Sequence, residues 1–424
     1  MDSLWLEIHD QVKQIPVIDT HEHLPHHDRF DPADSDILFD YLLHYMSSDL
    51  RSAGLSVEEL EQARSKHLPL DERWEIVAPY WEFCRCTGYG RALDLAVQGI
   101  YGVDGIRKET IVELGTLYKQ RRAEGHMRFV LKDLCRIELS ILDSWASHEP
   151  YDRELFRYAW QPTPFITASQ DKLRRLEEQG VTVNSLDDWL QAFSAALEEN
   201  LRRGVVALKN AMAYERTLYY EKVDYASAKS LFADTLTAWR TALERGSDPI
   251  LLPKAVQDFL MHYLLKEADA RGLVMQVHTG ILEGSGNVLA NGRPSLLNNL
   301  FLDYPNVKFD MFHISYPYCG EAGALGKMFP NVYLDMCWAH IISPAAAAAA
   351  LSDFLDAVPY NKIMGFGGDY GFVDGVYGHL VLARETISRV LAEKVRLGVF
   401  GVDQAVRIAE HLLYKNPKVL FSLS

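Results

Sequence analysis

The sequence predicts an α/β protein built on a (β/α)8 barrel (TIM barrel), with a helical insertion after the first strand. Eight short apolar, β-rich runs alternate with long helical stretches, and such alternation is typical of parallel α/β architectures. The runs are almost continuously apolar, as expected of parallel strands buried on both faces. They cover residues 17–20, 137–143, 158–165, 205–209, 273–278, 307–313, 332–335 and 363–367. Eight such strands favour a closed barrel over an open doubly wound sheet.

Two long helical sections interrupt this alternation. Residues from about 30 to 130 carry helical patterns at 36–46, 57–66, 72–84, 91–99 and 108–121, and we interpret them as an insertion that covers the barrel mouth. The second section, residues 225–271, is broken near Gly246 and Pro249. No Gly/Ser-rich linker divides the chain, so we expect residues 1–424 to form a single elaborated barrel domain.

The composition is that of an acidic globular protein. Its 43 basic and 58 acidic residues give a formal charge of −15, which argues against nucleic acid or an anionic membrane as the main partner. A small-molecule substrate is expected, and it can be anionic if a bound metal reverses the local potential. Five scattered cysteines suit a reducing compartment. The N-terminal stretch does not resemble a signal peptide and no run of about 20 apolar residues occurs, so we expect a cytoplasmic protein. The oligomeric state stays open, although homo-oligomers are common.

The most informative motif is His21-Glu22-His23, which directly follows the first apolar run. Residues i and i+2 of a strand point to the same side, so both histidines can reach one ion from the strand end. Histidine is the commonest metal ligand, because a neutral ring nitrogen is available near pH 7. Taken alone, the pair is explained equally well by two unrelated histidines beside a turn. Glu22 is expected to point away from the ion.

Four further polar residues close later strands. Lys209 ends the fourth run, His278 the fifth and His313 the sixth, while Asp369 lies just beyond the eighth. Active sites of α/β barrels gather at the carboxyl ends of the strands. Charged side chains deep in a barrel must be paired or bound to a metal. One ion, or two, therefore accounts for these residues and the histidine pair together.

This ordered pattern resembles the amidohydrolase superfamily, in particular its amidohydrolase-2 group. The resemblance implies that His21, His23 and Asp369 bind one divalent ion. In binuclear members Lys209 would be carboxylated and bridge to a second ion held by His278 and His313. In mononuclear members His278 joins the first set, and His313 acts as a catalytic base or electrophile. The sequence does not choose between these arrangements. Zinc suits the mixed ligands best, and manganese, iron or nickel would also fit.

Local stretches are similar to particular branches of this superfamily. Leu208 to Arg216 and His313 to Tyr318 resemble the amidohydrolase-like domain fused to glutamine-synthetase-like proteins. The long insertion is similar to that of uronate isomerases. The loops after the fourth, sixth and seventh strands supply candidate substrate-binding residues, with Arg216 as a bidentate carboxylate clamp; these candidates are Tyr214, Arg216, Tyr316 and Trp338.

The simplest mechanism is metal-assisted hydrolysis of an amide (C–N) or ester bond in a small metabolite. A bound ion lowers the pKa of its water to about 7. Asp369 would take the proton of this water as general base, and His313 or a metal would polarise the carbonyl group. Non-oxidative decarboxylation or uronate-type isomerisation of a small organic acid is the alternative. A catalytically silent barrel is a third hypothesis, against which the intact set of six residues argues.

Overall fold

The computed structural model describes residues 3–31, 33–144 and 150–423, and its centre is a barrel of eight parallel strands in sequential order. The strands are β1 (Val17–Glu22), β2 (Ile137–Ser144), β3 (Phe156–Trp160), β4 (Ala207–Asn210), β5 (Val274–Val277), β6 (Lys308–Met311), β7 (Val332–Asp335) and β8 (Ile363–Met364). Backbone hydrogen bonds join the two ends of the sheet, because Thr20 donates to Phe366 and Asp369 donates to His21. The predicted (β/α)8 barrel is therefore confirmed.

Two predicted strands need correction. The third run was predicted at 158–165, but β3 ends at Trp160 and the short helix α9 (Thr163–Ile166) follows. Pro162 and Pro164 lie in this stretch and have no N–H with which to continue a strand ladder. The eighth strand covers only residues 363–364, and the irregular backbone that follows it is hydrogen-bonded to β1 on one side and to Trp338, after β7, on the other.

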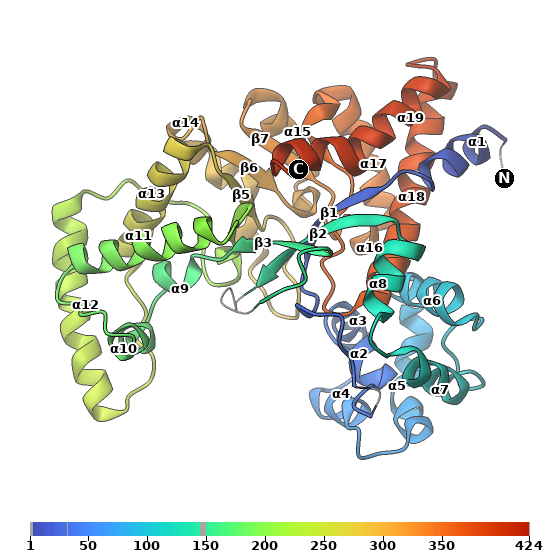
Figure 1. Cartoon of the computed structure of the whole chain (residues 1–424), viewed down its shortest axis with the longest axis horizontal. Coiled ribbons are helices and arrows are strands. Elements are labelled where there is room, and N and C mark those ends of the chain that lie inside the picture. The colour runs from blue at the N-terminus through green and yellow to red at the C-terminus, as the bar shows by residue number, and fades with distance from the viewer. Residues whose placement is uncertain (1–2, 32, 145–149, 424) are drawn as a thin grey trace.

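The insertion after β1 consists of seven α-helices, as far as the described residues show, ahead of β2. They are α2 (Ile37–Tyr41), α3 (Tyr45–Ala53), α4 (Val57–Arg64), α5 (Leu70–Cys84), α6 (Gly88–Tyr101), α7 (Ile111–Arg121) and α8 (His126–Arg128). Figure 1 shows them as a blue-to-cyan group on one side of the barrel. The helix predicted at 36–46 is two helices, separated by His44 with a positive φ of 57°.

The remaining helices surround the barrel. They are α1 (Ser3–Val12), α10 (Gln170–Glu178), α11 (Leu186–Arg202), α12 (Tyr225–Arg245), α13 (Lys254–Arg271), α14 (Asn298–Asp303), α15 (Cys319–Met328), α16 (Ala339–Ile342), α17 (Pro344–Ala357), α18 (Val373–Arg396), α19 (Val402–Glu410) and α20 (Asn416–Leu420). In Figure 1, α10 and α12 lie at the far end of the long axis from the insertion. Within the described ranges, none of the helices is long and apolar enough to cross a membrane.

Candidate metal centre

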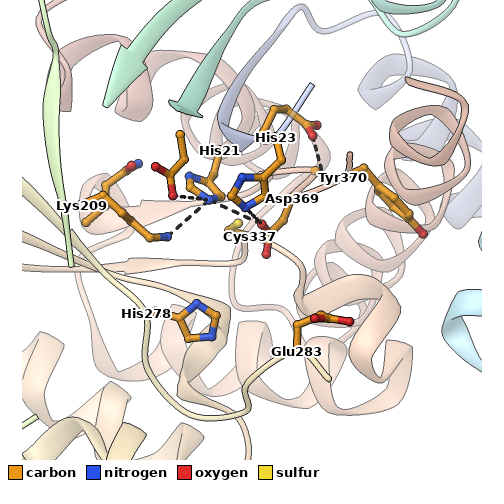
Figure 2. Close-up of polar contacts among 12 residues, drawn as sticks. His21, His23, Lys209, His278, Glu283, Cys337, Asp369 and Tyr370 are labelled. Carbon is orange, nitrogen blue, oxygen red and sulfur yellow. Dashed lines mark hydrogen bonds and ion pairs between the residues drawn. The ribbon is translucent and has the colours of Figure 1, made fainter. Parts of the chain in front are cut away.

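The six predicted ligands lie together at the carboxyl ends of the strands, and Figure 2 shows most of them. His21 and Lys209 belong to β1 and β4, and the other four directly follow a strand or lie in the loop after β8: His23, His278, His313 and Asp369. With the exception of His313, which is fully buried, they line a cavity of about 350 Å³. The fold thus brings residues from five strands to one site.

A first group of contacts joins β1 to the loop after β8. His23 Nε2 lies 3.1 Å from Asp369 Oδ1, and His21 Nε2 lies 3.5 Å from the same oxygen. Asp143, in β2, places its Oδ2 3.8 Å from His21 Nε2. One ligand atom of each of His21, His23 and Asp143 lies within 4.8 Å of the others, which is close enough for a shared cation.

His278 and His313 present acceptor nitrogens to each other. His278 Nε2 lies 2.9 Å from the carbonyl of Ile281, and His313 Nδ1 lies 2.9 Å from the carbonyl of Cys337. Because a carbonyl oxygen only accepts, these two nitrogens donate, and the second nitrogen of each neutral ring keeps its lone pair. These second nitrogens, His278 Nδ1 and His313 Nε2, lie 3.3 Å apart. Two lone pairs at this distance fit a shared cation or proton, and carbonyl-oriented rings are typical of metal-binding histidines.

The electrostatics favour the protonation states that bind metal. Burial lowers the pKa of His21 and of His278 well below the ordinary histidine value, and it lowers the pKa of His313 to about 4. Burial acts in the same direction on His23, but the hydrogen bond with Asp369 leaves the pKa of His23 raised. For Asp369, burial favours the neutral acid, yet the hydrogen bond with His23 and the neighbouring histidines hold its pKa well below the ordinary value. Neutral imidazoles and an ionised carboxylate are the forms that coordinate a metal.

Lys209 is a buried amine beside the histidines. Its Nζ lies 3.3 Å from His21 Nε2 and 3.9 Å from the centre of the Phe312 ring. Its side chain is among the largest that are fully buried, and in the described part of the chain it forms no salt bridge. A buried ammonium group without a carboxylate partner is costly, and deprotonation or chemical modification would remove that cost.

β1 also fixes the backbone that carries Asp369. Asp19 Oδ1 accepts a hydrogen bond from Gly368 N at 3.0 Å, and Glu22 Oε2 accepts one from Tyr370 N at 2.8 Å. As predicted, Glu22 therefore points away from the two histidines. Asp369 itself adopts a positive φ of 60°, which is uncommon for a residue other than glycine. Strained backbone of this kind is typical of functional sites, because neighbouring contacts must hold it in place.

Sequence reasoning missed several residues in or beside the cavity. Asp143 closes a strand just as the predicted ligands do, so the same rule could have found it. Cys337, with His313 and Asp369, forms a second group whose ligand atoms lie within 4.8 Å of one another. His44 and Tyr45 come from the insertion, and Glu283 from the loop after β5. Nothing in the sequence pattern marks these last three residues.

The predicted substrate-binding residues have different positions. Tyr214 lines the cavity, with its ring centre 4.8 Å from that of His278. Arg216 does not line it, because its guanidinium group lies 2.6 Å from Asp258 and also donates to the carbonyl of Tyr219. Tyr316 packs against the core and Trp338 is buried behind His313, so neither belongs to the described cavity lining; the ring centres of Trp338 and His313 are 5.0 Å apart.

Comparisons with known proteins show which proteins this chain resembles. Residues 236–401 match the family model described as Amidohydrolase (Amidohydro_2). Protein fluG of Emericella nidulans is 27% identical over 242 residues, which cover 55% of this chain and 27% of fluG, so the chain spans about a quarter of that relative. Uronate isomerase of Thermotoga maritima is 20% identical over 460 aligned positions, which cover 98% of this chain and 96% of the isomerase.

Solved structures share the fold over the whole chain. The crystal structure of the Thermotoga maritima uronate isomerase matches with a TM-score of 0.81 at 18% identity, and the match covers 99% of this chain and 98% of that one. A putative metal-dependent hydrolase from Lactobacillus casei matches with a TM-score of 0.64 at 18% identity, covering 98% and 97% of the two chains. At these identities the likeness shows the barrel fold. The family match over residues 236–401 and the two relatives confirm the resemblance to the amidohydrolase superfamily that the strand-end motifs predict.

Proposed function

We propose that the protein is a metal-dependent hydrolase that cleaves an amide or ester bond in a small molecule. The observation that carries this proposal is the convergence of His21, His23, His278, His313 and Asp369, with Lys209, around one cavity. A cavity of about 350 Å³ is within the size range of small-molecule sites.

The ligand chemistry fits a divalent cation, most simply zinc. The ring nitrogens of His21 and His23 and the carboxylates of Asp143 and Asp369 form one candidate ligand set. His278 and His313 form the second. Mixed nitrogen and oxygen ligands suit zinc, and also manganese, iron or nickel. When bound, the ion supplies Lewis acidity, which makes hydroxide available at neutral pH. A carboxylated Lys209 would add an anionic ligand between the two sets.

Asp369 and His313 have different roles in the proposed hydrolysis. Asp369 accepts the proton of the attacking water and returns it to the leaving amine or alcohol, as expected of an ionised carboxylate held between histidines. His313, neutral and anchored through Nδ1, directs its Nε2 toward the same carboxylate at 3.9 Å. The net reaction adds one water across the C–N or C–O bond and yields an acid and an amine or alcohol.

Asp369→Asn is the direct test. We expect the zinc-loaded variant to lose hydrolysis of a panel of small amides and esters by at least about a hundredfold, the usual contribution of a general base. Asp234→Asn is the matched control, because Asp234 is exposed on α12 and remote from the cavity lining. Metal content, measured by mass spectrometry, separates loss of the ion from loss of the base. Unimpaired hydrolysis by metal-loaded Asp369→Asn protein would overturn the proposal.

A second candidate is isomerisation of a uronate, or another non-hydrolytic reaction of an organic acid such as decarboxylation. Its support is the similarity to uronate isomerases over nearly the whole chain. The same substrate panel decides between the candidates. Aldose–ketose conversion or release of carbon dioxide without any hydrolysis would favour the second one.

A further inference from the structure

The cavity of the proposed metal centre is lined mainly by acceptors and negative charges. Its described lining residues include four carboxylates, Asp143, Glu215, Glu283 and Asp369, of which Asp143 and Asp369 are candidate metal ligands. Lys209 is the only lysine among these lining residues, and none of them is an arginine. One ring nitrogen of His278 and one of His313 are held by carbonyl groups and His23 contacts Asp369, whereas His21 Nδ1 has no hydrogen-bond partner among the described residues. An anionic substrate would therefore find few positive groups beyond the metal itself.

Two buried acceptor atoms in this lining have no hydrogen-bond partner within the described residues. They are Oδ1 of Asp143 and Oε1 of Gln161, and both side chains are 5% exposed. The two side chains are hydrogen-bonded to each other: Gln161 Nε2 donates to Asp143 Oδ2 at 2.5 Å. A buried unpaired acceptor costs about 1–3 kcal/mol, so this pair suits a ligand that brings N–H or O–H donors.

Glu283 adds a carboxylate on another side of the cavity. Figure 2 shows it apart from the cluster of His21, His23 and Asp369. One oxygen accepts a hydrogen bond from Ser48 Oγ at 3.3 Å, and in the described part of the chain no cation forms a salt bridge with it. Burial raises the pKa of Glu283, because the charged form lacks a compensating partner. A positively charged group in the cavity would supply that partner.

Apart from Lys209, the cationic side chains near the cavity are directed elsewhere. Arg216, the clamp that the sequence predicts, is held by Asp258 and by the carbonyl groups of Thr217 and Tyr219. Arg293, on the far side of the loop after β5, pairs with Glu321. The cavity thus combines free acceptors with a shortage of cationic donors.

We propose that the cavity selects substrates that carry a primary ammonium group, with Glu283 as its counter-ion and the Asp143–Gln161 pair accepting hydrogen bonds from the substrate. This inference rests on the proposed hydrolase function and specifies its substrate: an amide or ester of a small amine-bearing acid. Glu283 acts here as a specificity residue, since it faces the ligand and not the reacting bond.

The binding test uses zinc-loaded protein and ligands that cannot be hydrolysed. Calorimetry measures the Kd of butylamine, 1-butanol and butyrate for the unchanged protein and for Glu283→Gln. We expect Glu283→Gln to raise the Kd of butylamine about tenfold, the equivalent of about 1.4 kcal/mol, and to change the Kd of 1-butanol less than twofold. Glu244→Gln is the control, because Glu244 is exposed on α12 and lies outside the cavity lining. Unchanged butylamine binding in Glu283→Gln, or an equal loss for 1-butanol, overturns the inference.

A turnover test separates this inference from the proposed function. The four amides 4-aminobutanamide, 4-hydroxybutanamide, butanamide and succinamic acid differ only in one end group. We expect 4-aminobutanamide to have the highest kcat/KM of the four. In Glu283→Gln this kcat/KM should fall about tenfold because KM rises, while kcat stays within twofold. Hydrolysis with a preference for succinamic acid leaves the hydrolase proposal intact and overturns the ammonium inference. Butylamine binding that depends on Glu283, without hydrolysis of any amide, supports the inference and overturns the hydrolase.

Discussion

The two long helical sections of this chain differ in what they contribute to the cavity. The insertion of α2–α8 places His44 and Tyr45 in the cavity lining, whereas α12 and α13 supply none of the described lining residues. Figure 1 shows the two sections at opposite ends of the molecule. We infer that the insertion after β1 is part of the site and that α12 and α13 are scaffold.

A buried aspartate is among the contacts that hold each section to the barrel. Asp374, at the start of α18, binds the insertion through Tyr41, Tyr101 and His126. Asp258, in α13, binds Arg216 and Lys254. Replacing either aspartate should lower the stability of the protein. Only the replacement of Asp374 should also disturb the residues that line the cavity. Variants at these two aspartates therefore test the difference between the two sections.

Asp374→Asn is expected to have the largest effect. Asp374 is a buried carboxylate bound by three side chains, and a hydrogen bond to a charged group contributes about 1.5–3 kcal/mol, so the free energy of unfolding at pH 7 should fall by about 4 kcal/mol. KM should also rise, because the insertion carries His44 and Tyr45. Urea denaturation and steady-state kinetics measure the two effects. Asp403→Asn is the control, since Asp403 lies in the first turn of α19 but is exposed, and its effect should stay within about 0.5 kcal/mol.

The stability contributed by Asp374 should also depend on pH. Burial favours the neutral form, but the hydrogen bond and charge of His126 outweigh it and leave the pKa of Asp374 below the ordinary value. A depressed folded-state pKa stabilises the protein above the unfolded value of about 3.9, and this contribution disappears as the pH falls through the folded-state pKa. The difference between the unchanged protein and Asp374→Asn should therefore shrink below about pH 3.9. An equal difference at pH 3 and pH 7 would show that Asp374 acts only by packing.

Asp258→Asn should lower the free energy of unfolding by about 3 kcal/mol, slightly less than Asp374→Asn. The effect is smaller because one of the two cationic partners of Asp258, Lys254, is partly exposed. Asp258 is fully buried, so the loss comes from leaving Arg216 without its carboxylate. Metal content and KM should not change. A raised KM or a lost ion in Asp258→Asn would show that the α12–α13 section acts on the site, and would contradict the division between scaffold and site.

The sequence predicts the ligand positions better than it predicts the rest of the cavity, and the reason is geometric. A strand fixes where its last residue points, so His21, Lys209, His278 and His313 could be assigned from the ends of apolar runs. Arg216 lies several residues beyond a strand, where the path of the loop decides the partner, and its partner is Asp258. His44 and Tyr45 depend on a helix break that periodicity does not reveal, because residues 36–46 read as one helix.

Tyr45→Phe probes the insertion with a smaller change. The Tyr45 hydroxyl is buried and donates to the backbone carbonyl of Asp369, so its removal leaves that carbonyl without this partner. We expect kcat to fall about tenfold, the equivalent of about 1.4 kcal/mol, with KM nearly unchanged. Tyr80→Phe is the control, because Tyr80 belongs to α5 and lies outside the cavity lining. If both variants keep full activity, the insertion covers the site without positioning Asp369.

Ser48→Ala is expected to have the smallest effect and addresses the link between the insertion and the loop after β5. Ser48, in α3, donates to Glu283 at 3.3 Å, which is a long hydrogen bond, so its loss should cost less than about 1 kcal/mol. The Kd of butylamine should change by no more than about threefold, since Glu283 keeps its charge. Ser52→Ala, at an exposed position of the same helix, should change nothing. A tenfold rise in the Kd of butylamine for Ser48→Ala would be as large as that expected for Glu283→Gln. It would mean that α3, and not the carboxylate charge, determines binding at this side of the cavity.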